Sequence, residues 1–328
     1  MKTQAIVIPM PGCVELREVE VPAPTPHDVV VRTLYSGISV GTERHYISGA
    51  YGEMGQDVKA NYPFATGYQR CGVVEQVGSD VDGLRAGDLV ILGRSRLSDP
   101  DLKGSAGHVG LGVCDARDAY RLPIGVDPEE AAFWVMVGVG LHGSRLSRVK
   151  PNDVVAVVGL GMIGQMAAQA ARRRGATVIA SDSDEQRVRL GAASAQDAFL
   201  GTPEEFAAYL LTDHPDGVDI VVDTGSKVAI WDTCMRMVRR EGMINLQGYY
   251  PGSFVIDSYA AHGHRVTVVC PSGYDAPETI ADALGSGDFA VKPLITHRFQ
   301  AGDAAAAYEV VMRTPWEIVG GVIDWTQE

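Results

Sequence analysis

Three glycines that follow a run of β-branched residues carry the clearest chemical signal in the sequence. Gly159, Gly161 and Gly164 form a G-x-G-x-x-G pattern directly after residues 154–158. The first glycine of such a pattern permits a tight turn, the second lets the backbone approach a pyrophosphate, and the third lets the following helix pack against the strand. Because the first N–H groups of that helix face the phosphates, the pattern predicts a dinucleotide-binding site.

An acidic residue stands where the adenosine ribose of such a cofactor would lie. Asp182 follows a second predicted strand, residues 177–181, and its carboxylate can accept hydrogen bonds from ribose hydroxyls. Asp184 and Glu185 come next and would repel a 2′-phosphate, which favours NAD over NADP. Arg187 could instead attract that phosphate, but we prefer a surface pair with Asp184 or another acid.

The elements around these residues fall into two patterns. Up to about residue 120, short strands are broken by Pro, Gly and Asp, as in a β-rich domain with partly open barrel character. From about residue 127 helices and strands alternate, which predicts a parallel sheet covered on both faces. The last helix and strands are expected to rejoin the first domain. We therefore expect domains at 1–125 and 126–268 and a returning C-terminal segment at 269–328.

The expected strands are residues 5–9, 15–21, 29–37, 72–77, 89–93, 154–158, 177–181, 220–223, 243–247, 295–299 and 321–325. One expected helix begins at residue 128, and the others span residues 162–174, 185–191, 228–238 and 303–313.

Composition excludes several classes of function. The 328 residues suffice for two cores, and a net charge of −13 disfavours nucleic acid and anionic membranes as partners. The longest apolar run, residues 131–141, is too short to span a membrane and reads as a buried helix. The first ten residues hold no cleavable apolar core, and the five cysteines are widely spaced, as in reduced cytosolic proteins. We expect a soluble, cytoplasmic protein.

Several ordered segments resemble the medium-chain dehydrogenase/reductase superfamily. Residues 36–45, S-G-I-S-V-G-T-E-R-H, resemble that family's C-G-x-C-G-T-D-x-H segment, and residues 67–78 resemble G-H-E-x-x-G-x-V-x-x-V-G. Residues 87–90, 150–153, 223–226 and 295–299 also fit the family's plan. The first segment is also similar to that of bacteriochlorophyllide hydroxyethyl dehydrogenases. Because this likeness is limited to one short stretch, it does not indicate the same substrate.

The resemblance implies an α/β chain with a GroES-like β-rich catalytic domain and a Rossmann domain built on a doubly wound parallel sheet. It also implies a homodimer that pairs edge strands at residues 266–270 across a two-fold axis. The residues then expected to bind NAD are Gly159, Gly161, Met162, Ile163, Gly164, Asp182, Arg187, Thr224, Gly225 and Gly248.

The family's zinc ligands are missing from the matching positions. The cysteine falls at Ser39 or Val40, the histidine becomes Tyr68, and the neighbouring glutamate becomes Gln69. The region of the third ligand, residues 135–143, offers only His142, at a non-ligand position, and residues 93–112 contain no cysteine for a structural zinc lobe. Zinc prefers thiolate, imidazole or carboxylate ligands, so we predict a protein without zinc.

A zinc-free dehydrogenase must replace the metal with hydrogen-bond donors. Tyr68 is our first choice for the proton donor or oxyanion partner, and the alternative is a ring that fills the vacated space. Thr42 and His45 match the family's proton-relay positions, although His45 could instead contact ribose or lie on the surface.

The remaining residues of that segment have less specific roles. Glu43 is expected to hold the local backbone. Arg44, Tyr46 and Tyr51 either line the substrate entrance or form a solvated loop.

Three functions fit these residues. The relay pair favours an alcohol–ketone dehydrogenase that uses NAD. An enone or quinone reductase would need only positioned NAD(P)H and solvent protons, and a non-enzymatic NAD sensor would need no relay. The expected partner is a small-molecule substrate, whose identity the sequence does not disclose.

Overall fold

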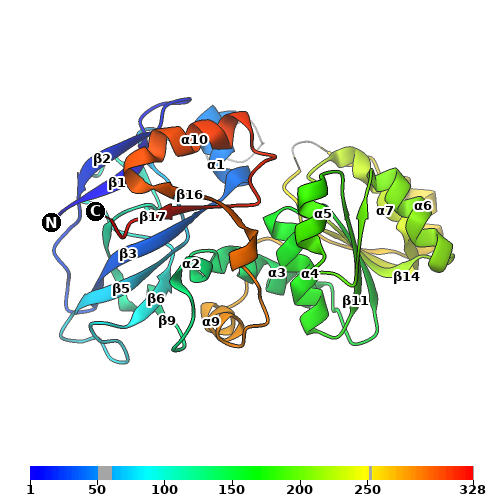
Figure 1. Ribbon diagram of the computed structural model, residues 1–328, viewed down its shortest axis with the longest axis horizontal. Helices are drawn as coiled ribbons and strands as arrows, with labels where there is room; N and C mark the ends of the chain where they lie inside the picture. Colours follow the sequence, from blue (N-terminus) through cyan, green and yellow to red (C-terminus); the bar gives the residue numbers. More distant parts are fainter. Residues whose placement is uncertain (51–60, 251–252, 328) are drawn as a thin grey trace. The chain divides into compact units, whose positions relative to one another are not determined.

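The computed structural model describes residues 1–50, 61–250 and 253–327 (Figure 1). The chain forms two compact units. Unit 1 comprises residues 1–134, 277–286 and 291–328, and unit 2 comprises residues 135–276 and 287–290. The divisions at 134/135 and 276/277 fall nine and eight residues after the expected boundaries at 125/126 and 268/269. Tyr51 lies outside the described residues.

Unit 1 is built on two β-sheets. One has the order β2-β1-β4-β7, and the other has the order β16-β17-β3-β5-β6-β9, with β8 also paired to β3. The strands are β1 (Lys2–Ile8), β2 (Glu15–Glu20), β3 (Asp28–Ile38), β4 (Phe64–Ala65), β5 (Arg70–Val77), β6 (Leu89–Leu92), β7 (Lys103–Gly104), β8 (Leu111–Asp115), β9 (Tyr120–Arg121), β16 (Ile295–Gln300) and β17 (Gly320–Asp324). The GroES-like β-rich fold expected for this part of the chain is confirmed.

The end of the chain completes the second of these sheets. β17 lies between β16 and β3 and runs antiparallel to β3, with Gly321 opposite Ile38. The apolar face of α10 packs into a core that includes Ile6, Ile8 and Ile47. The helical segments of unit 1 are α1 (Val40–Ser48), η2 (Ala116–Asp118), α2 (Pro128–Ala131), α9 (Pro277–Gly285), η4 (Lys292–Leu294), η5 (Ala301–Asp303) and α10 (Ala304–Arg313).

Unit 2 is a six-stranded parallel sheet in the order β12-β11-β10-β13-β14-β15. This order confirms the doubly wound Rossmann fold. Its strands are β10 (Val154–Val158), β11 (Thr177–Asp182), β12 (Asp197–Leu200), β13 (Val218–Asp223), β14 (Val238–Leu246) and β15 (Thr267–Val269). Its helical segments are α3 (Trp134–Leu146, which begins at the unit boundary), α4 (Met162–Arg173), α5 (Glu185–Gly191), α6 (Pro203–Asp213), η3 (Val228–Ile230), α7 (Trp231–Met237) and α8 (Ser258–His264).

Several details of unit 2 differ from the sequence expectation. The helix expected at 228–238 is split into η3 and α7, and β14 begins at Val238 instead of residue 243. The early start arises because Val238 pairs with Val218 before an irregularity in the register, where Glu241 has φ +61°. β12 and α6 were not expected, since the ends of β12 are exposed and its apolar signal is weak.

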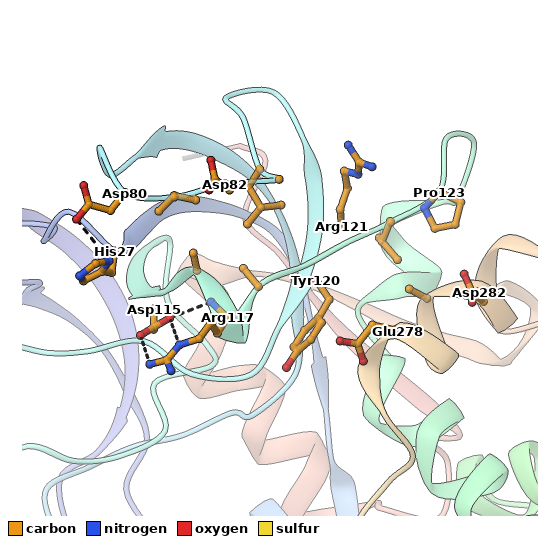
Figure 2. A pocket seen from close by; sticks show the side chains of 17 residues that line it. His27, Asp80, Asp82, Asp115, Arg117, Tyr120, Arg121, Pro123, Glu278 and Asp282 are labelled. Carbon is orange, nitrogen blue, oxygen red and sulfur yellow. Dashed lines mark hydrogen bonds and ion pairs between the residues drawn. The ribbon is translucent and has the colours of Figure 1, made fainter.

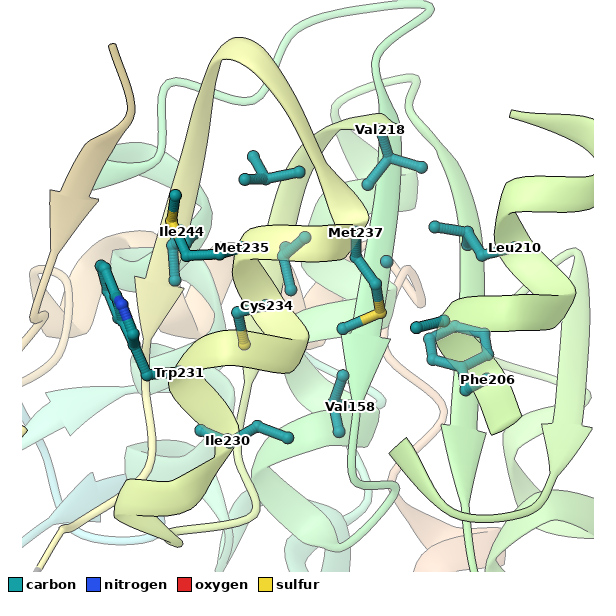
Figure 3. Packing of buried hydrophobic residues seen from close by; sticks show 14 of the residues in the cluster. Val158, Phe206, Leu210, Val218, Ile230, Trp231, Cys234, Met235, Met237 and Ile244 are labelled. Carbon is teal, nitrogen blue, oxygen red and sulfur yellow. The ribbon is translucent and has the colours of Figure 1, made fainter. Parts of the chain in front are cut away.

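Helices α6 and α7 cover one face of this sheet through a dense apolar core. Phe206 and Leu210 of α6 and Met237 of α7 pack toward Val158 and Val218 of the sheet (Figure 3). Burial of these apolar side chains stabilises the sheet. It thereby fixes β10, whose carboxyl end is followed by the glycine-rich turn. Within the described residues, no helix is both long and apolar enough to cross a membrane.

Candidate functional site

The turn after β10 is held open by backbone geometry and one hydroxyl. Gly159 has φ +90°, and its N–H donates to Ser181 O at 2.8 Å. The Thr224 hydroxyl lies 3.0 Å from both Val158 O and Gly159 O. A Cβ on Gly164 would lie 1.8 Å from Gly159 O, so only glycine allows α4 to begin here.

The space above this turn fits a pyrophosphate. A Cβ on Gly161 would meet only the Arg187 guanidinium, at 3.9 Å, and Gly161 is the N-cap of α4 without a side-chain hydrogen bond. The first N–H groups of a helix have no partner within it, and in α4 they belong to Met162, Ile163 and Gly164. They supply donors and positive potential at the position that phosphate oxygens require.

Asp182 is fixed beside the same turn. Its Oδ2 accepts from Leu160 N at 2.7 Å and its Oδ1 from Asp184 N at 3.0 Å. Arg187 Nη1 lies 3.8 Å from the Asp182 carboxylate. The Asp184 carboxylate caps α5 by accepting from Arg187 N. The arginine side chain therefore faces Asp182 and not Asp184.

The carboxyl ends of β13 and β14 bring together the other expected cofactor residues. Gly225 N donates to Asp223 Oδ1 at 3.1 Å, and Gly248 N donates to Asp223 O, also at 3.1 Å. A Cβ on Gly248 would lie 2.8 Å from Ser226 Oγ. Thr224 joins this group to the turn after β10, so one edge of the sheet gathers all ten residues named from the sequence.

In unit 1, α1 presents the expected relay residues on a firmly held frame. Thr42 and His45 are half-buried, whereas the side chain of Glu43 between them is 0% exposed. Desolvation lowers the pKa of His45, and the nearby Arg44 lowers it further, so the imidazole is neutral at pH 7. A neutral imidazole can accept a proton, as a relay requires.

Glu43 is the centre of a buried polar cluster formed by Ser36, Glu43, Thr66, His108, Tyr308 and Trp325, which we call the Glu43 cluster. The carboxylate accepts from Ser39 N at 2.8 Å, from the Thr66 hydroxyl at 3.0 Å, and from the Tyr308 hydroxyl. Burial opposes its ionisation, yet His108 and these hydrogen bonds prevail and hold the pKa of Glu43 below its ordinary value.

His108 extends the cluster toward the Tyr68 segment. Its Nε2 lies 3.2 Å from Glu43 Oε2, and its Nδ1 lies 2.7 Å from Ser36 Oγ, which also accepts from Trp325 Nε1 at 2.8 Å. A Cβ on Gly67 would meet the His108 ring at 2.5 Å. The imidazole therefore packs against the backbone directly before Tyr68.

The residues at the family's zinc positions do not fit a metal. The family's cysteine position holds Ser39 or Val40, neither of which offers a thiolate. Tyr68 is half-buried, and the buried Gln69 donates from Nε2 to Gly37 O at 3.3 Å. A carboxylate could not make that donation. His142 lies instead beside Asp275, at 3.2 Å. In residues 1–50, 61–250 and 253–327, no three His, Cys, Asp or Glu side chains are placed to hold a metal ion.

A hollow of about 1100 Å³ in unit 1 lies apart from these residues (Figure 2). It is lined by the β5–β6 connection, by residues 115–123 and by α9, and the expected catalytic residues do not line it. Asp115 pairs with Arg117, and Asp80 lies 3.8 Å from His27. Asp82, Arg121, Glu278 and Asp282 also line the hollow.

Sequence reasoning missed His108, Tyr308 and Trp325, which were not singled out. They come from three distant segments that converge only in the fold. It also missed Tyr250, whose hydroxyl bonds Asp223. The one available signal was a histidine between Gly107 and Val109 in an otherwise apolar stretch.

Known proteins share both units. Residues 25–118 match the alcohol dehydrogenase GroES-like domain, and residues 163–286 match the zinc-binding dehydrogenase family. An uncharacterized zinc-type alcohol dehydrogenase-like protein of Escherichia coli (strain K12), YdjJ, is 28% identical over 98% of this chain and 99% of its own. L-idonate 5-dehydrogenase of Vitis vinifera is 27% identical over 89% of this chain and 87% of its own.

Solved structures agree over the full length. An Escherichia coli oxidoreductase/dehydrogenase of unknown specificity has a TM-score of 0.87 and 25% identity, covering 99% of each chain. A Sinorhizobium meliloti 1021 structure bound to NADP has a TM-score of 0.85 at 22% identity, covering 99% of each chain. An Escherichia coli CFT073 alcohol dehydrogenase in complex with NADH has a TM-score of 0.85 at 19% identity, covering 98% of this chain and 99% of its own.

The glycine turn, the GroES-like unit and these matches define a nicotinamide-dependent oxidoreductase. Its two units match the alcohol dehydrogenase GroES-like domain and the zinc-binding dehydrogenase family, and the whole chain is similar to zinc-type alcohol dehydrogenase-like proteins.

Proposed function

We propose that this protein is an NAD-dependent, zinc-independent dehydrogenase that interconverts a small secondary alcohol and its ketone. The observation that carries the proposal is the Glu43 cluster, which anchors the helix bearing Thr42 and His45. The metal-ligand positions meanwhile hold Tyr68 and either Ser39 or Val40. A sensor that only binds nucleotide has no use for so firmly held a relay helix.

The residues divide the chemistry as follows. A nicotinamide cofactor held by the turn after β10 and by Asp182 would supply the hydride chemistry between the carbinol and carbonyl carbon. Tyr68 hydrogen-bonds the substrate oxygen and donates a proton as a ketone is reduced to the alcohol. Thr42 and the neutral His45 return a proton from solvent to the site.

Relatives with printed activities support the choice of substrate class. L-idonate 5-dehydrogenase and sorbitol dehydrogenase both act on polyhydroxylated carbon chains. We therefore propose a polyol or sugar-acid alcohol as substrate. A screen of polyols, sugar acids, simple alcohols and enones with NAD⁺ or NADH tests this, and turnover confined to enones would establish the reductase instead.

Metal independence is tested on the same preparation. Protein purified without chelator should contain far less than one zinc per chain and should keep its turnover after dialysis against a chelator. Stoichiometric zinc, or loss of activity that zinc restores, would refute this part of the proposal.

We propose NAD as the preferred cofactor because the Asp182 carboxylate, with two backbone N–H donors holding it in place, is set to accept from ribose hydroxyls. Arg187 already pairs with that carboxylate. Fluorescence titration with NADH and NADPH tests the preference, and tighter binding of NADPH would overturn it.

We also propose a cytoplasmic homodimer with no nucleic-acid or membrane partner. β15 ends the six-stranded sheet, and an open strand edge favours pairing with a second copy. The five cysteines are free thiols, as in a reducing compartment. Light scattering at micromolar concentration should give the mass of two chains, and a monomer would refute it.

A further inference from the structure

Tyr250 closes over the carboxyl end of β13 in unit 2. Its hydroxyl lies 2.5 Å from Asp223 Oδ2 and 3.0 Å from Asp223 O. A phenol has one proton to donate, and the shorter contact assigns it to the carboxylate. The ring packs against Phe254, with centroids 5.0 Å apart, so the hydroxyl is aimed at Asp223 by packing as well as by the hydrogen bond.

Asp223 is the point at which two loops are joined. Its side chain is 0% exposed, and its only other carboxylate bond within the described residues is from Gly225 N. Its carbonyl accepts from Gln247 N at 2.9 Å and from Gly248 N at 3.1 Å. Burial raises the pKa of Asp223 despite the bond from Tyr250. Removing that bond would leave a desolvated carboxylate with one donor.

A second contact ties the same loops. Tyr249 N donates to Ser226 Oγ at 3.0 Å, and Ser226 itself has φ +59°, a conformation that a serine keeps only when its surroundings impose it. Residues 224–226 and 248–250 therefore form one clamped pair, which we call the β13–β14 clamp.

The sheet order tells which part of a dinucleotide would meet this clamp. The pyrophosphate turn follows β10, and Asp182, at the ribose position, ends β11 on one side of β10. β13 and β14 lie on the other side. A dinucleotide bound across the carboxyl edge of such a sheet puts its two halves on opposite sides of the turn, so the clamp faces the nicotinamide half.

We propose that Tyr250 is a positioning residue that, by hydrogen-bonding Asp223, shapes the β13–β14 clamp for the nicotinamide riboside half of the cofactor and leaves the adenosine half unaffected. The inference rests on the proposed binding of NAD. It assigns a task to a tyrosine that matches no motif of the sequence.

The test separates the two halves of the ligand. Calorimetric titration with NADH and with ADP-ribose, which lacks nicotinamide, is carried out on the full-length protein and on Tyr250→Phe. The variant should bind NADH about 10-fold more weakly, equivalent to about 1.4 kcal/mol, and should bind ADP-ribose within about twofold of the unchanged protein. Retained ADP-ribose binding also shows that unit 2 is folded.

Two further measurements complete the design. Tyr259→Phe is the matched control, because Tyr259 is 88% exposed on α8 and its variant should bind both ligands normally. The nicotinamide fluorescence of bound NADH should move toward that of free NADH in Tyr250→Phe alone. Unchanged NADH affinity, or equal weakening of both ligands, would overturn the proposal. Failure of the unchanged protein to bind either ligand would instead refute the proposed NAD dependence on which it rests.

Discussion

The turn after β10 and the Glu43 cluster both hold candidate functional groups, but the chain builds them from different materials. The turn takes its shape mainly from the backbone at Gly159 and Gly164, which lie within six residues of the sequence, and the side chains of Thr224 and Asp182 only bond that backbone. The Glu43 cluster joins residues up to 289 positions apart, as between Ser36 and Trp325. A turn made of backbone tolerates change nearby, whereas a buried polar cluster fails when any one member leaves a partner unsatisfied.

The largest expected effect comes from removing the centre of the cluster. Glu43→Ala leaves His108 and the Tyr308 hydroxyl buried without their acceptor, so the free energy of unfolding of unit 1 should fall by about 3–5 kcal/mol. Urea unfolding followed by tryptophan fluorescence measures it. Glu185→Ala, at an exposed position, is the control and should change stability by less than about 0.5 kcal/mol. A loss as small in Glu43→Ala would mean that the cluster is not a stabilising unit.

The next effect concerns the proton donor. Tyr68→Phe keeps the ring but removes the hydroxyl, and should lower kcat by about 10²-fold, the usual scale for a general acid. NADH affinity, measured by fluorescence titration, should barely change. Near-full turnover of the variant on the true substrate would make Tyr68 a space-filling residue and favour the reductase with a solvent proton.

The turn gives a smaller and purely steric effect. Gly164→Ala forces a methyl group against Gly159 O, which should cost unit 2 about 1–3 kcal/mol and weaken NADH binding at least about 10-fold. Thermal unfolding and NADH titration measure the two losses. Gly263→Ala on α8, where a Cβ would meet no atom within 4 Å, should lower neither quantity, because alanine is the better helix former. Normal NADH binding by Gly164→Ala would show that the turn can shift without harm.

The smallest effect depends on pH. The pKa of His45 is lower in the folded protein than its ordinary value because of desolvation and Arg44. The unfolded chain therefore takes up a proton first as the pH falls below about 6.5, and His45 costs stability from there down to its folded pKa. His45→Gln should lose less stability than the unchanged protein between pH 7.5 and 5.5, as thermal melts at several pH values would show. Parallel pH profiles would contradict the lowered pKa.

The two regions also differ in how well the sequence predicted them. Gly159, Gly161, Gly164 and Asp182 were found because local spacing alone determines the turn and the strand end beside it. His108 and Tyr308 gave no such signal, since each is an ordinary residue until the fold brings it to Glu43. The structural role expected for Glu43 was right in kind, but its partners could not be named from neighbours in the chain.

The ion pair of Arg187 shows that even a partner close in the sequence could not be identified from the sequence alone. The sequence offered Asp184 or another acid as its partner, and the structure places Arg187 beside Asp182, whereas the Asp184 carboxylate caps α5. The start of α5, and with it the Asp184 cap, could be predicted because helix starts have sequence signals. The direction of a long side chain such as that of Arg187 is set by packing, which the sequence does not show.

The position of β17 has a consequence for how the protein is made. β17 and α10 are synthesised after the whole sheet of unit 2, yet β17 lies inside the sheet of unit 1, between β16 and β3. Once β15 has left the ribosome, all six strands of the unit 2 sheet have been synthesised. β17 has not, so one edge of β3 is still unpaired. Until β17 is synthesised, the nascent chain has one complete sheet in unit 2 and one incomplete sheet in unit 1 with an open edge, the kind of surface that chaperones cover.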